Sequence, residues 1–184
     1  MTRRPAAAQT ALGPMVIAAA EQHEPPGWRL LDDGLALGLL PITMRGAVRI
    51  CRWPAVRRAM IAASERRAPG IWGGVLRRKH FADDQVGAAF GAGVTQLVVL
   101  GAGLDSRACW LTPPGASAYE LDLQANVADK RRRLQARFGR VPEHVRLIGV
   151  DFETADLGGG AGRARLPGGQ RGGVRVGGGH AVPD

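Results

Sequence analysis

A short apolar run that ends in Gly-Ala-Gly, within residues 98–111, constrains the fold of this chain more than any other feature. The run contains two β-branched residues, which favour a buried strand, and Gly101 and Gly103 follow it directly. Glycine tolerates a positive φ and lacks the Cβ atom that would keep a ligand away from the backbone. The pattern therefore predicts the strand-to-loop junction at which open α/β sheets bind nucleotide-like ligands, with an ordinary strand-to-helix turn as the alternative.

Two further strands are predicted downstream, and each ends in an aspartate. Residues 118–121 precede Asp122, and residues 145–150 precede Asp151. A charged helix is expected over residues 126–138, and another helix before the first strand, so helices and strands alternate as in a doubly wound parallel sheet. Because the carboxyl ends of parallel strands meet at one edge, both carboxylates are expected beside the glycine loop.

These side chains suit the hydrogen-bonding groups of a nucleoside. Asp122 stands about 20 residues after the glycine loop, where a carboxylate can accept both hydroxyls of a ribose. Capping the next helix is its other candidate role. Asp151 could accept from an adenine amino group and Phe152 could pack on the purine, although a turn and a core position suit them equally. Asp105 either contacts a ligand amine, orients the loop, or caps the turn after it.

The choice of ligand depends on Ser106. A nicotinamide or flavin dinucleotide usually requires a third glycine, so that its pyrophosphate sits at a helix start, and Ser106 stands at that position. S-adenosylmethionine has no phosphate and needs only the close backbone approach and the ribose acid. The sequence therefore favours S-adenosylmethionine, and a nicotinamide-dependent (NAD or NADP) oxidoreductase fragment is the first alternative.

Residues 96–108 resemble the signature of the leucine carboxyl methyltransferase family, and more narrowly its bacterial S-adenosylmethionine-dependent methyltransferases. Residues 119–122 resemble the family's ribose site, and Lys130 matches a basic residue usual in the next helix. Residues 150–152 resemble its adenine-site pair, where Asp-Leu is commoner than Asp-Phe. The resemblance covers about residues 15–157.

The resemblance implies an α/β fold: a Rossmann-like class I methyltransferase sheet, incomplete with three parallel strands, behind an N-terminal helical cap. It implies S-adenosyl-L-methionine as cofactor and methyl transfer to a carboxylate or hydroxyl oxygen of a small molecule. Arg78 matches an arginine that contacts the carboxylate of the cofactor's methionine part, and it is otherwise one more surface arginine. No catalytic base is predicted. The implied cofactor-binding residues are Arg78, Gly101, Gly103, Asp105, Asp122, Asp151 and Phe152.

Four segments are predicted along the chain. Residues 1–14 are expected to form a disordered leader, and residues 15–82 an N-terminal helical cap with helices over 15–22, 35–40, 44–52 and 55–63. Residues 83–157 are expected to form the N-terminal half of the cofactor-binding domain, with its first helix over 83–92. Residues 158–184 are predicted to be a non-native tail rich in glycine and arginine.

The tail departs from the family, because residues 158–184 hold 11 of the 27 glycines and show almost no periodicity. The family is expected to continue with a strand that carries Trp-Glu-Gly-Val-Thr-x-Tyr-Leu. With suitable codons, residues 174–184 read one base later encode Phe-Ala-Trp-Glu-Gly-Val-Thr-Gln-Tyr-Leu. We therefore expect a frame change after about residue 157, a truncated sheet with an exposed strand edge, and weak or absent methyl transfer. A flexible low-complexity tail is the alternative.

The formal net charge of +9 raises the alternative of a non-enzymatic basic fragment that binds acidic partners. The arginines are spread along predicted helices and the chain has one tyrosine, so specific nucleic-acid binding is not expected. The four histidines and two cysteines show no metal-ligand spacing, and no metal is predicted. No apolar run is long enough to span a bilayer, and a cytoplasmic location without membrane contact is expected.

Overall fold

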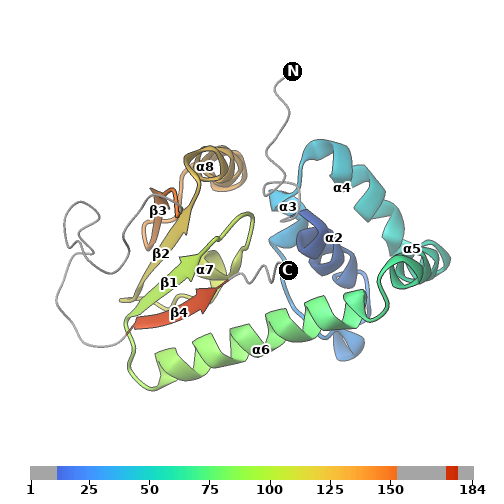
Figure 1. Ribbon diagram of the computed structural model, residues 1–184, viewed down its shortest axis with the longest axis horizontal. Coiled ribbons are helices and arrows are strands. Elements are labelled where there is room, and N and C mark those ends of the chain that lie inside the picture. The colour runs from blue at the N-terminus through green and yellow to red at the C-terminus, as the bar shows by residue number, and fades with distance from the viewer. Residues whose placement is uncertain (1–11, 153–172, 178–184) are drawn as a thin grey trace. The chain divides into compact units, whose positions relative to one another are not determined.

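The computed structural model describes residues 12–152 and 173–177 (Figure 1). Over these residues the chain divides into two compact units. A helical unit contains the described residues up to Gln85 together with Leu104–Ser106. A sheet unit contains Val86–Gly103 and the described residues from Arg107 onward. The division falls inside a helix, close to the predicted boundary between residues 82 and 83.

The helical unit forms the helices expected of a cap, with shifted ends. The first helix begins at Leu12, inside the segment predicted as a leader, because Pro14 is tolerated in a first helical turn. The break expected at Pro54 is present, but Pro54 is itself the first residue of the second helix, which continues to Arg67 rather than ending at residue 63. The elements are α2 (Leu12–Glu21), η1 (Pro26–Trp28), α3 (Ala36–Leu39), α4 (Ile42–Arg49), η2 (Ile50–Arg52) and α5 (Pro54–Arg67).

A buried arginine ties these helices together. Arg57 of α5 is 6% exposed, and its Nε donates to Glu24 Oε1 at 2.5 Å. Its Nη1 donates to the carbonyl oxygens of His23 at 3.2 Å and Cys51 at 3.0 Å. A charge this deeply buried requires such partners, so Arg57 joins α5 to η2 and to the segment that follows α2.

Helix α6 (Ile71–Gly91) is longer than the helix predicted over residues 83–92. Its first turns contain Gly73 and Gly74, and glycine is unfavourable in a helix interior. Four residues there, Trp72, Val75, Leu76 and Lys79, are buried at helical spacing. Packing of this face therefore outweighs the local preference.

Three parallel strands form where they were expected. The elements are β1 (Gln96–Leu100), α7 (Arg107–Trp110), β2 (Ser117–Asp122), α8 (Gln124–Phe138) and β3 (Val145–Gly149). Leu97 lies opposite Ala118, which lies opposite Val145, and all three belong to one buried apolar cluster. This α/β arrangement confirms the predicted Rossmann-like fold class.

The sheet contains one strand more than expected, in the order β3-β2-β1-β4 (Figure 1). Strand β4 (Gly173–Gly177) pairs parallel with β1 and comes from the segment predicted as a non-native tail. Its sequence is Gly-Val-Arg-Val-Gly, and valine favours a strand. The N–H and C=O groups on the edge of β1 can pair with such an extended segment. The rest of that tail lies outside the described residues.

Candidate functional site

The glycine loop leaves the sheet in the conformation that its sequence predicts. Gly101 has φ 62° and Gly103 has φ 48°, both in the left-handed region. A Cβ atom built on Gly101 would meet no atom within 4 Å, so backbone conformation rather than crowding requires glycine there. The Gly101 N–H donates to the Leu121 carbonyl at 2.8 Å, which holds the start of the loop beside β2.

Asp122, the last residue of β2, contacts this loop directly. Its Oδ2 accepts a hydrogen bond from the Gly103 N–H at 2.5 Å. Its Oδ1 accepts from the Leu123 N–H and from Asn126 Nδ2, both at 2.7 Å. The side chain therefore orders both the glycine loop and the first turn of α8. A carboxylate has about four acceptor positions, so these bonds leave room for about one more donor.

Asp151 and Phe152 follow β3 and are both exposed, with Phe152 at 37%. The Val150 N–H donates to the Asp122 carbonyl at 2.8 Å, which places the end of β3 next to the end of β2. The chain thus brings the predicted adenine-site pair to the same edge of the sheet as Asp122 and Gly103. An exposed aromatic ring at this edge can pack on a flat ligand.

Asp105 belongs to the helical unit, where it lies near a lysine. Lys79 Nζ is 3.5 Å from Asp105 Oδ2 and 3.9 Å from Asp33 Oδ2. Asp33 also accepts a hydrogen bond from Ser106 Oγ at 2.6 Å. Burial raises the pKa of the Asp33 carboxyl, and the Ser106 hydrogen bond and the Lys79 charge oppose that shift.

Arg78 and Lys79 are neighbours on α6 with opposite exposure. The Arg78 side chain is exposed, whereas Lys79 is 7% exposed and contacts the loop residue Asp105. A contact of Arg78 with the carboxylate of a ligand therefore stays a prediction. The sequence alone assigned no role to Lys79. Its position three and four residues after the buried Leu76 and Val75 is the signal that could have found it.

A buried ion pair supports β2 just before Asp122. Lys130 Nζ of α8 lies 2.6 Å from Glu120 Oε2, with exposures of 2% and 1%. Lys130 is the basic residue singled out in the sequence, and its partner makes it a link between α8 and β2. The geometry gives it a structural role in joining these two elements.

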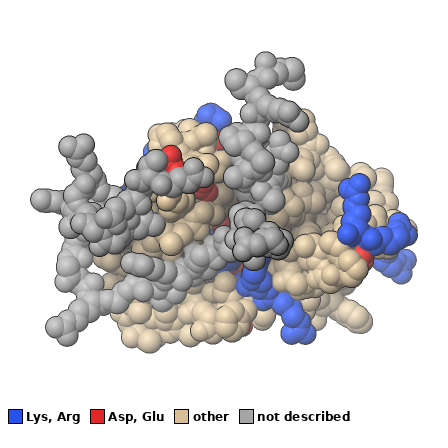
Figure 2. All heavy atoms as spheres, viewed as in Figure 1, with Lys and Arg blue, Asp and Glu red and all other residues tan. Residues whose placement is uncertain are grey.

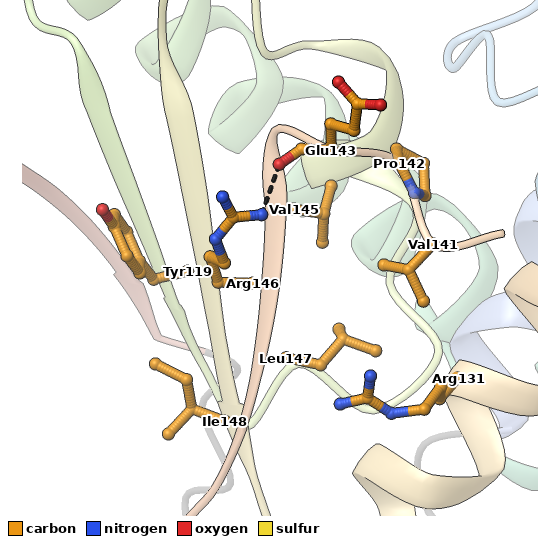
Figure 3. Close-up of a pocket in the computed structure, with 9 residues that line it drawn as sticks. All are labelled: Tyr119, Arg131, Val141, Pro142, Glu143, Val145, Arg146, Leu147 and Ile148. Carbon is orange, nitrogen blue, oxygen red and sulfur yellow. Dashed lines mark hydrogen bonds between the residues drawn. The ribbon is translucent and has the colours of Figure 1, made fainter. Parts of the chain in front are cut away.

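A pocket of about 490 Å³ lies along β3 in the sheet unit (Figure 3). Figure 3 shows Tyr119 and Arg131 on opposite sides of the strand, and Arg146 donating to the Glu143 carbonyl. None of the seven predicted cofactor-binding residues lines it. We therefore place the candidate site at the glycine loop, where Asp122 and the end of β3 lie, and not in this pocket.

No group of three or more His, Cys, Asp or Glu side chains in residues 12–152 could hold a metal ion. Within the same part of the chain, no helix combines the length and the apolar character needed to cross a membrane.

Comparisons with known proteins converge on one family. The model of a family described as leucine carboxyl methyltransferase matches residues 11–160. A provisionally named S-adenosyl-L-methionine-dependent methyltransferase of Mycobacterium bovis is 46% identical over 77 residues, which cover 41% of this chain and 24% of that protein. Similarly named proteins of Mycobacterium marinum and Mycobacterium avium are 43% and 41% identical, over 24% and 22% of their lengths. The chain thus matches about a quarter of the length of these curated relatives.

Proposed function

This chain belongs to the leucine carboxyl methyltransferase family, and we propose that it binds S-adenosylmethionine as a methyl donor at the glycine loop after β1. The hydrogen bond from the Gly103 N–H to Asp122 Oδ2, at 2.5 Å, carries the proposal. It brings the loop backbone and a strand-end carboxylate together, which is the combination that a ribose at this edge requires. The names of the mycobacterial relatives support the same donor.

The described residues fit this donor better than a dinucleotide. Ser106 stands where a dinucleotide loop has its third glycine, and it is fully buried with its hydroxyl bonded to Asp33. It therefore presents neither a bare backbone nor a free hydroxyl to a pyrophosphate. S-adenosylmethionine carries no phosphate, so it does not require a third glycine at this position.

Five of the seven predicted site residues contribute side chains, and each has a role in this proposal. Asp122 accepts from the ribose, Asp151 accepts from the adenine amino group, and Phe152 packs on the purine. Asp105 contacts the ammonium of the methionine part and Arg78 its carboxylate. The donor supplies an electrophilic methyl group when bound, and these residues hold it in line for an acceptor.

For the molecule that accepts the methyl group, we propose only a chemical class. The family description names a carboxyl group, which supports transfer to a carboxylate or hydroxyl oxygen of a small molecule. No described residue is assigned as a catalytic base. Because the sequence predicts weak or absent turnover, donor binding and methyl transfer need separate measurements.

Calorimetric titration of the purified chain with S-adenosylmethionine, and separately with NADH and NADPH, tests the donor. We expect saturable binding of S-adenosylmethionine and none of the dinucleotides. Binding of a dinucleotide alone would instead support the oxidoreductase alternative. Transfer of a radiolabelled methyl group to a panel of small carboxylic acids and alcohols then measures turnover.

A basic fragment without enzymatic function would give another result. Lys and Arg side chains gather over α5 in the face that Figure 2 shows (blue), and few carboxylates accompany them there. Binding to DNA that weakens steeply as salt rises, with no binding of S-adenosylmethionine, would support that alternative.

A further inference from the structure

We propose that Asp33, a buried carboxylate of the helical unit, is a positioning residue that holds Asp105 and Ser106 of the glycine loop for donor binding. The proposal rests on the proposed function, since it concerns the same donor site. It assigns a role in that site to a residue far upstream in the chain, between η1 and α3.

The Asp33 side chain is 1% exposed, so no ligand reaches it. Its Oδ2 accepts the hydrogen bond from Ser106 Oγ at 2.6 Å, and Ser106 is fully buried. A hydrogen bond to a charged acceptor is stronger than one between neutral groups, and removing it would leave a buried hydroxyl unsatisfied. Asp33 thereby fixes Ser106, and the backbone of its neighbour Asp105 with it.

Lys79 provides a second connection between the two carboxylates. Its Nζ lies 3.9 Å from Asp33 and 3.5 Å from Asp105, and its side chain is 8% exposed. The Asp105 side chain is 23% exposed, so it is the member of the group that a ligand can reach. Without the Asp33 charge, Lys79 would interact with Asp105 alone and compete more strongly with a ligand ammonium.

Asp33 is itself held by the helical unit. Its N–H donates to Gln22 Oε1 at 3.2 Å, and its Oδ1 accepts from the Leu35 N–H at 3.3 Å. Gln22 Nε2 in turn donates to the carbonyls of Ala18 and Leu31, both at 3.0 Å. These bonds involve no loop residue, so the support exists before the donor binds, as a preorganised site requires.

The first test compares donor affinity in matched variants of the full chain. Asp33→Asn removes the charge and Ser106→Ala removes the hydroxyl. Asp32→Asn changes a neighbouring carboxylate that is 83% exposed, and Ser64→Ala removes a hydroxyl that donates to the Met60 carbonyl within α5. We expect Asp33→Asn and Ser106→Ala each to weaken S-adenosylmethionine binding about tenfold, while the control variants change it less than about twofold. The loss of affinity in the double variant should be smaller than the product of the two single losses, because both substitutions act on the Asp33–Ser106 hydrogen bond.

The second test needs no donor. Hydrogen–deuterium exchange of the peptide that spans residues 101–107 should be faster in Asp33→Asn and Ser106→Ala than in the controls. If the wild-type chain binds S-adenosylmethionine, the donor affinities of the variants decide the test. Unchanged affinity in both Asp33→Asn and Ser106→Ala then overturns the proposal, even if their hydrogen–deuterium exchange is faster. If the wild-type chain does not bind it, the proposed function fails and exchange decides whether Asp33 holds the loop. Unchanged exchange would then overturn the positioning role as well.

Discussion

Lys130 Nζ and Glu120 Oε2 lie 2.6 Å apart, with their side chains 2% and 1% exposed. Glu120 lies on β2, two residues before Asp122, and Lys130 lies on α8, the helix that follows Asp122. The pair therefore joins the two elements on either side of the carboxylate that holds the glycine loop. A charge at such a position is tolerated only together with its partner.

Replacing Lys130 alone should destabilise the fold. Lys130→Met leaves the Glu120 carboxylate buried without its cation, and we expect the free energy of unfolding in urea to fall by about 3–5 kcal/mol. The double variant Lys130→Met with Glu120→Leu should recover most of that loss. Arg132→Met, on the same helix but with a side chain that is 69% exposed, should change stability by less than about 0.5 kcal/mol. A Lys130→Met variant as stable as this control would contradict the structural role.

Asp122→Ala should affect both stability and donor binding. It removes the acceptor of three hydrogen bonds, from the N–H groups of Gly103 and Leu123 and from the Asn126 amide. We expect a loss of about 1–3 kcal/mol in the free energy of unfolding and a loss of donor affinity greater than tenfold, at about 1.4 kcal/mol per tenfold. Asp129→Asn, which changes a carboxylate that bonds Arg133 on α8, serves as the control. Equal donor affinities in the two variants would remove Asp122 from the site.

Stability should depend on pH through His23. Burial, and then the positive charges of three arginines, lower its pKa below the ordinary value of 6.5, although a hydrogen bond with the Val48 backbone opposes the shift. Because the unfolded chain takes up a proton more readily, stability is fully present above pH 6.5 and is lost as pH falls below it. Between pH 7.5 and pH 5.5, wild type should therefore lose more free energy of unfolding than His23→Gln. Parallel losses in the two proteins would contradict this assignment.

The codons for the tail test the predicted frame change. The family match ends at residue 160, close to the change of composition after residue 157. Read one base later, the codons for residues 174–184 should encode Trp-Glu-Gly-Val-Thr. Codons that do not give this sequence would make the low-complexity interpretation the better one.

The sequence predicted the features of the site that depend on neighbours in the chain. The run before Gly101 fixed the first strand, and the aspartate after the second strand lies against the loop as expected. It did not predict Asp33 as part of the loop's support, because the partner of Asp33 is 73 residues away and local periodicity carries no information on such a pair. The full length of α6 was missed for a related reason, since burial of one face overrides the glycines in its first turns.

The two hydrogen bonds that hold the glycine loop close chain segments of very different length. The bond between Gly103 and Asp122 spans 19 residues, whereas the bond between Ser106 and Asp33 spans 73. The entropy lost on closing the longer segment exceeds that of the shorter by about 1 kcal/mol, from the logarithmic dependence on length. During folding, the Gly103 end of the loop is therefore expected to become ordered first, and the Ser106 end only once the upstream helices are in place.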